Sequence, residues 1–139
     1  MATFIVSGSR GTDDPTMATL PFMAAKTAKA PEDFLTKTNP LSSFAGSIQA
    51  GKELFLKTAQ PIACAMCHGE QGDGKGIKGA ALVPPPRNFT CGSMMKDISD
   101  GQLFWIIKNG SPGTGMMPFS GLPDEQVWQL IHYVRSLAK

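Results

Sequence analysis

Cys64, Cys67 and His68 stand in the order C-x-x-C-H within residues 64–68. Two thiols at this spacing can form thioethers with the two vinyl groups on one edge of a porphyrin. The imidazole of the next residue can then reach the iron from one face. The spacing is a chemical requirement of covalent attachment, and it predicts one covalently attached haem c.

The same residue types also bind zinc or form redox-active dithiols. A structural zinc site needs four ligands, and the only further Cys and His in the chain are Cys91 and His132. A thioredoxin-like dithiol would be expected beside a βαβ pattern, which the sequence lacks. Both alternatives are therefore weaker than haem attachment. Cys91 is left over, and we expect it to be a small buried hydrophobe rather than a disulfide partner or a reactive thiol.

The composition limits the class of protein. A chain of 139 residues with a net charge of +2 suits one domain and gives no electrostatic footprint for nucleic acid. No run approaches eighteen apolar residues, so no transmembrane segment is predicted. Residues 1–10 lack the pattern of a secretory signal. Because c-type haem is normally attached outside the cytoplasm, we expect a periplasmic or otherwise extracytoplasmic protein whose leader was removed or replaced.

Residues 1–45 differ from the rest of the chain. They contain four prolines and no sustained helical or strand period, which predicts a partly irregular N-terminal extension. Residues 46–139 are predicted to form the haem domain.

Three helices are expected in this domain. The first begins behind a possible cap at Ser47 and ends before Pro61. The second spans 99–109 and begins with the capping-box pattern Ser99-x-x-Gln102. The third begins at Pro123 and runs almost to the last residue. On this third helix His132 falls on the polar side, so we expect a solvated histidine rather than an iron ligand.

A second iron ligand is suggested by residues 113–119, which read G-T-G-M-M-P-F. Gly and Pro keep this segment out of helix, and both Met116 and Met117 offer a thioether. A methionine paired with a histidine raises the reduction potential of haem and suits electron transfer.

With these motifs in place, the sequence from about Asn39 to Leu137 resembles the class I monohaem cytochromes c. The resemblance rests on the C-x-x-C-H pentad, on residues 112–116 and on the terminal helix 128–137. It implies an all-α cytochrome c fold, with three main helices and loops wrapped around one haem. The first and last helices would cross, with Gly51 and Phe55 facing Leu130 and Tyr133.

The resemblance leaves a choice of methionine. Alignment forward from Gly113 and backward from Phe119 selects Met116 as the axial ligand, whereas alignment on the Met-Pro pair selects Met117. Met94 or Met95 is a more remote alternative.

The resemblance also implies further contacts with the haem. A backbone carbonyl of a loop proline would hold the second nitrogen of His68, with Pro84 as the first candidate and Pro85 as the second. Arg87 and Trp105 resemble residues that approach the haem propionates.

The implied function is electron transfer by Fe(II)/Fe(III) cycling, by a carrier that is not itself an enzyme. We expect a monomer that meets redox proteins through a small apolar patch ringed by charges such as Lys75, Lys78 and Lys108. Two alternatives stay open. The chain could be a haem subunit or domain of a larger redox enzyme, or an open-site haem peroxidase or gas sensor.

Overall fold

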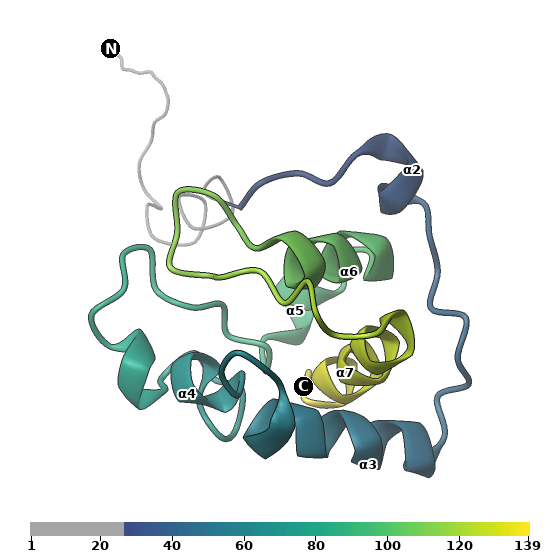
Figure 1. Cartoon of the computed structure of the whole chain (residues 1–139), viewed down its shortest axis with the longest axis horizontal. Coiled ribbons are helices and arrows are strands. Elements are labelled where there is room, and N and C mark those ends of the chain that lie inside the picture. The colour runs from purple at the N-terminus through teal and green to yellow at the C-terminus, as the bar shows by residue number, and fades with distance from the viewer. Residues whose placement is uncertain (1–26) are drawn as a thin grey trace.

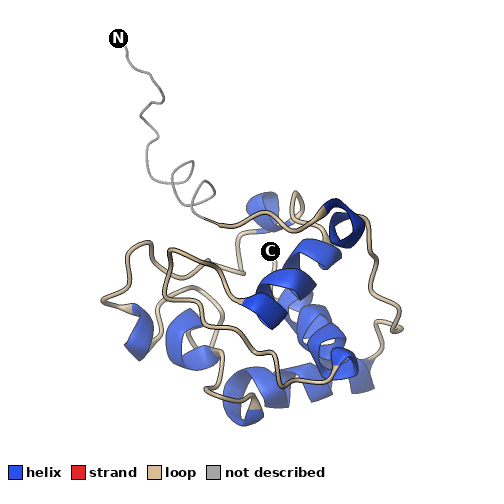
Figure 2. Cartoon of the chain, turned by 45° about the horizontal axis from the view of Figure 1, so that its top comes forward, coloured by secondary structure: helices blue, strands red, loops and turns tan. Residues whose placement is uncertain are grey.

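The computed structural model describes residues 27–139, and every regular element within this range is helical (Figures 1 and 2). The elements are α2 (Glu32–Leu35), α3 (Ala45–Glu53), η1 (Leu54–Thr58), α4 (Ala65–His68), η2 (Ile77–Gly79), α5 (Gly92–Met95), α6 (Asp100–Asn109) and α7 (Asp124–Ser136). The predicted all-α class is confirmed. The first 26 residues, which include most of the predicted extension and all of residues 1–10, lie outside the described range.

The first and last long helices, α3 and α7, pack side by side (Figure 1). The helices approach so closely at Gly51 that a Cβ atom there would stand 2.1 Å from the carbonyl oxygen of Gln129. One turn further on, the rings of Phe55 and Tyr133 lie with centroids 5.3 Å apart. The predicted crossing and its small and aromatic residues are confirmed.

Helix α3 begins at Ala45, two residues before the predicted cap. Ser47 is buried inside the helix and does not cap it. It precedes Gly51 by four residues, so the two share one helical face, and a small side chain suits that face. The helix then widens into the π-helical turn η1, where the amide of Ala59 donates to the carbonyl of Leu54 (3.1 Å). It ends before Pro61, as predicted.

Helix α6 begins as expected, because the Ser99 hydroxyl accepts a hydrogen bond from the amide of Gln102 (3.0 Å). The second half of the predicted capping box does not form. Instead, the Gln102 amide side chain donates to the Ala28 carbonyl (2.8 Å) and accepts from the Ala30 amide (2.8 Å). Gln102 therefore holds the segment that precedes the domain. We call residues 27–44 the strap.

The strap continues across the molecule to α7. Phe34 stacks against Phe104 of α6 with ring centroids 6.2 Å apart, and the Asn39 side chain donates to the Trp128 carbonyl (2.9 Å). Further along, His132 Nε2 lies 2.8 Å from the Leu41 carbonyl oxygen. The prediction of a solvated His132 was wrong in part, because the strap contacts its imidazole and leaves the side chain half-buried. The prediction that His132 stays away from the iron is compatible with this contact.

Replacing Gln102 by alanine should loosen the start of the strap, since both of its hydrogen bonds to residues 28–30 would be lost. Each bond contributes about 1 kcal/mol. We expect amide hydrogen exchange at Ala30 to accelerate by roughly tenfold or more. Gln49→Ala is the matched control, because Gln49 is exposed on α3. Unchanged protection of Ala30 in the Gln102 variant would contradict this account of the strap.

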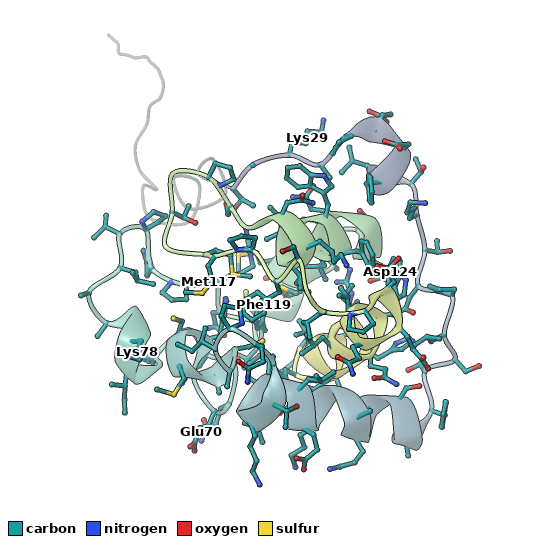
Figure 3. The ribbon with its side chains drawn as sticks, viewed as in Figure 1. Lys29, Glu70, Lys78, Met117, Phe119 and Asp124 are labelled. Carbon is teal, nitrogen blue, oxygen red and sulfur yellow. The ribbon has the colours of Figure 1, made fainter. Side chains whose placement is uncertain are left out.

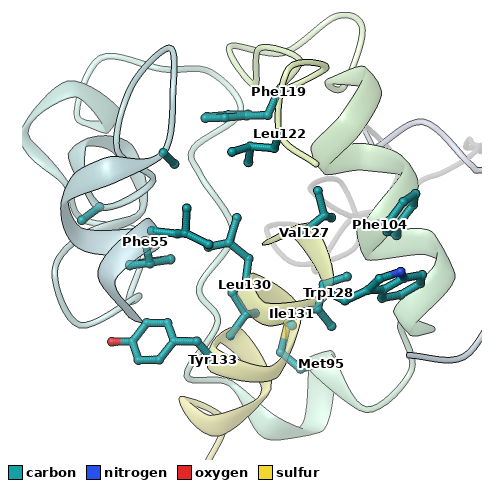
Figure 4. Close-up of a cluster of buried hydrophobic side chains, with 14 residues drawn as sticks. Phe55, Met95, Phe104, Phe119, Leu122, Val127, Trp128, Leu130, Ile131 and Tyr133 are labelled. Atoms are coloured by element: carbon teal, nitrogen blue, oxygen red, sulfur yellow. The ribbon is translucent and has the colours of Figure 1, made fainter. Parts of the chain in front are cut away.

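The core lies between α7, the end of α3 and the segment 119–122 (Figure 4). Phe55, Val127, Leu130 and Ile131 are at most 1% exposed. To one side, Trp128 stacks on Phe104 with centroids 4.3 Å apart. Several of these side chains also form one wall of the cavity described next.

Candidate cofactor site

A cavity of about 690 Å³ lies between the helices and the loops. Its size falls within the range of roughly 300–1,000 Å³ that is typical of ligand and cofactor sites. Its lining is largely apolar and includes residues of the strap, the C-x-x-C-H turn, α6 and α7, and both proline- and methionine-containing loops. Among the lining residues are Thr27, Lys29, Phe55, Cys64, Cys67, His68, Leu82, Pro84, Pro85, Pro86, Arg87, Phe89, Met94, Ile106, Ser111, Met116, Met117 and Ile131.

Cys64 and Cys67 reach this cavity from the turn formed by α4. Burial raises the pKa of the Cys64 thiol to about 12, so its sulfur enters the cavity as a neutral group. The glycine-rich loop behind the turn approaches its backbone closely. The Gly76 amide donates to the Cys67 carbonyl (3.0 Å), and a Cβ atom at Gly76 would stand 2.4 Å from the Met66 carbonyl oxygen. Glycine at this position therefore lets the loop support the attachment turn.

The imidazole of His68 is fixed on two sides. Its Nδ1 lies 3.1 Å from the carbonyl oxygen of Arg87, and its ring stacks on Phe89 with centroids 4.4 Å apart and planes 20° apart. Burial lowers the pKa of His68 to about 4, so the ring is neutral. A neutral imidazole that donates from Nδ1 presents Nε2 as a metal ligand.

The prediction that the Pro84 carbonyl holds His68 was wrong. Pro84 and Pro85 line the cavity, but the carbonyl that meets the imidazole belongs to Arg87. The chain returns to the attachment turn only after the proline run, where the Phe89 amide donates to the Gly72 carbonyl (2.7 Å). This pairing brings the backbone of residue 87, rather than that of residue 84, over the imidazole.

Arg87 also reaches the cavity with its side chain. Its guanidinium donates to the hydroxyl of Thr27 in the strap (3.0 Å), and burial lowers its pKa from the ordinary value. Within residues 27–139 it has no carboxylate partner. Because charges withdrawn from water are normally paired, this half-buried guanidinium suits an anionic group such as a haem propionate. Lys29 of the strap is a second cation in the lining. The sequence motifs missed Thr27 and Lys29, since both precede the domain.

Trp105 does not line the cavity. Successive residues of a helix are about 100° apart, so Leu103, Ile106 and Ile107 share the face of α6 that lines the cavity. Trp105 falls on a different face. The structure therefore corrects the expectation that Trp105 lies beside the cofactor.

Met116 and Met117 both line the cavity. Met116 is half-buried and packs against the core, whereas Met117 is 37% exposed and lies near Phe119 in Figure 3. The backbone around Met116 is held at both ends. Its amide donates to the Thr114 hydroxyl (3.1 Å), and its carbonyl accepts from the Ser111 amide (3.1 Å). Of the remote alternatives, Met94 lines the cavity and Met95 is buried in the core.

These residues fit a haem. Two cysteines, a neutral imidazole and three thioethers line one apolar cavity, and a half-buried guanidinium without a carboxylate partner in the described range faces it. The hydroxyl oxygen of Ser111 is buried and has no hydrogen-bond partner within residues 27–139. No group of three His, Cys, Asp or Glu side chains that could hold a metal ion occurs among residues 27–139. The zinc alternative therefore has no support in this part of the chain.

A helical fold around a C-x-x-C-H turn and a cavity of this kind define a c-type cytochrome. The model of the family described as cytochrome C oxidase, cbb3-type, subunit III matches residues 46–134, so the chain belongs to this family. The protein accordingly carries covalently bound haem c and functions in electron transfer.

A similar solved structure is a chain of the reducing HAO-like protein complex of Kuenenia stuttgartiensis. The two chains are 30% identical and superpose with a TM-score of 0.60. The match covers 72% of this chain but only 47% of that chain, so the similarity spans less than half of the neighbour. Among the described residues, no helix has the length and apolar character needed to cross a bilayer.

Proposed function

We propose that the protein is an extracytoplasmic monohaem electron carrier in which His68 and Met116 are the axial ligands. The observation that carries the proposal is that a fixed, neutral imidazole and a constrained thioether line one apolar cavity. The bound haem would supply one-electron chemistry by cycling between Fe(II) and Fe(III).

The protein's own residues would keep the coordination geometry constant between these two states. The Arg87 carbonyl and the Phe89 ring orient His68, and the hydrogen bonds of Thr114 and Ser111 orient the Met116 backbone. Iron ligands that move little on electron transfer keep the reorganisation energy of that step small. Apolar side chains of α6 and α7 limit the access of water and so favour a higher reduction potential.

A peroxidase would instead need an open iron site with an acid or base beside it, and a gas sensor would need an open iron site. The loop that carries the thioethers favours the electron-carrier function over these alternatives. Its residues in the cavity lining are Ser111, Thr114, Gly115, Met116 and Met117. None of these side chains titrates near neutral pH.

Binding of carbon monoxide to the reduced holoprotein tests this proposal. We expect little binding, because both axial positions are taken. A ferric iron that is high-spin, together with rapid and tight binding of carbon monoxide after reduction, would refute the carrier assignment.

A second candidate is that the chain works as a haem subunit or domain of a larger redox enzyme. It is favoured by the similarity to part of a chain from a redox complex. Isolation of natively expressed protein under mild conditions, followed by measurement of its mass in solution, distinguishes the two. A stable assembly with a larger redox enzyme favours the subunit, and a monomer that exchanges electrons with several partners favours the free carrier.

Redox partners would meet the face beside the attachment turn. Ile77 and Val83, on the loops that follow this turn, are 87% and 84% exposed, and Lys75 and Lys78 are exposed close to them in sequence. Lys108 is less suited to the contact, because its ammonium group donates to the Leu122 carbonyl (2.8 Å) and pairs with Asp124 (3.1 Å). An apolar patch with few cations fits brief docking.

A further inference from the structure

Ser111 presents a buried hydroxyl to the cavity just after the end of α6. The residue is 5% exposed and belongs to the cavity lining. Its Oγ is the one buried side-chain nitrogen or oxygen atom within residues 27–139 that has no hydrogen-bond partner. An unpaired buried hydroxyl is costly, so such a group in a native protein calls for an explanation. An acceptor that comes within reach of the hydroxyl when the cofactor is bound would explain it.

The loop places Ser111 beside Met116, the proposed iron ligand. The Ser111 amide donates to the Met116 carbonyl (3.1 Å), so the two residues are paired across the loop, and both line the same cavity. The other hydroxyl of this loop, that of Thr114, already has hydrogen-bond partners. Thr114 Oγ1 donates to the Ser111 carbonyl (2.7 Å) and accepts from the Met116 amide (3.1 Å). Ser111 is therefore the residue of the loop whose buried hydroxyl is available as a donor.

We infer that the Ser111 hydroxyl donates a hydrogen bond to the thioether sulfur of Met116 when that sulfur binds the iron. This inference rests on the proposed function, because it requires Met116 as the axial ligand. A thioether sulfur is a weak acceptor, but here it would be the partner of an otherwise unpaired donor. Ser111 is then a positioning residue that acts on the iron through Met116.

Such a bond has two consequences. It withdraws electron density from the sulfur, which favours Fe(II) over Fe(III) and raises the reduction potential. It also keeps the thioether on the ferric iron, which binds sulfur less tightly, and so resists replacement by an external ligand.

The test compares Ser111→Ala with wild-type holoprotein and with Ser120→Ala, whose serine is exposed in the segment after Phe119. Ser111→Ala removes one unpaired oxygen atom and should fold. We expect the Fe(II)/Fe(III) equilibrium to shift about threefold toward Fe(III), which corresponds to roughly 30 mV because tenfold corresponds to 59 mV for one electron. The sulfur-to-iron charge-transfer band of the ferric protein should move, and ferric affinity for added imidazole should rise about threefold. Ser120→Ala should match wild type.

Two results would overturn the inference. In the first, Ser111→Ala keeps the wild-type potential, band and imidazole affinity. In the second, the potential moves while the band and the affinity do not, so the hydroxyl serves an acceptor other than the sulfur. Both leave the proposed function intact, provided that wild type shows the charge-transfer band. Absence of this band from wild type would refute the His68/Met116 ligation itself.

Discussion

Replacing Met116 by alanine should abolish the sulfur-to-iron charge-transfer band and lower the reduction potential by on the order of 0.1 V, a fraction of the roughly 0.8 V range that axial ligands span. The reason is that the thioether stabilises Fe(II), and water or a weaker ligand would take its place. The optical spectrum of the ferric protein and a potentiometric titration measure both effects. The reduced variant should also bind carbon monoxide, which the wild type should resist.

Met117→Ala is the matched control, because Met117 is adjacent, lines the same cavity and carries the same side chain. It is 37% exposed, so its loss should leave the charge-transfer band in place and shift the potential only slightly. If Met117→Ala abolishes the band and Met116→Ala keeps it, the ligand is Met117. If neither variant loses it, Met94 becomes the next residue to replace, since it also lines the cavity.

Gly51→Ala should destabilise the holoprotein by about 3 kcal/mol. The added Cβ would stand 2.1 Å from the Gln129 carbonyl oxygen and 2.9 Å from the Tyr133 Cβ atom. These are backbone or first side-chain atoms that no rotamer change can move, so α3 and α7 would have to separate. Phe55, in η1 directly after α3, and Leu130 of α7 line the cavity, and we expect the haem spectrum to broaden as well. Denaturant unfolding followed by far-ultraviolet circular dichroism measures the loss.

Gly46→Ala provides the control on the same helix. The three atoms nearest to its Cβ would all belong to the ring of Phe44, which is 59% exposed and can turn away. Since alanine is the better helix former by about 1 kcal/mol, this change should be neutral or slightly stabilising. An equal effect of the two substitutions would mean that the close approach of α3 and α7 does not limit the stability of the fold.

Local sequence signals predicted the parts of this protein that depend on local chemistry. The cap at Ser99 and the acidic residues at the start of α7 act within one helical turn. The C-x-x-C-H spacing matches the two vinyl groups on one edge of a porphyrin. The crossing of α3 and α7 was also predictable, because Gly51 and Phe55 lie one turn apart and resemble a known pair of positions.

Apart from the cap expected at Ser47, which lies inside α3, the errors concern contacts between segments that are distant in the chain. The residue that holds His68 lies 19 positions away, and the proline run did not reveal where the backbone would return. The side chain of Gln102 had two possible partners, its own helix start and the strap, and only the fold decides between them. The same holds for His132, which is half-buried against the Leu41 carbonyl, 91 positions away.

Near-infrared magnetic circular dichroism of the ferric holoprotein tests the central claim most directly, because the position of its charge-transfer band depends on both axial ligands. We predict one low-spin species with histidine and methionine ligation in wild type, and loss of the methionine signature in Met116→Ala. A high-spin wild-type spectrum, or a spectrum of two nitrogen ligands, would contradict the account of this protein as an electron carrier with His68 and Met116 on the iron.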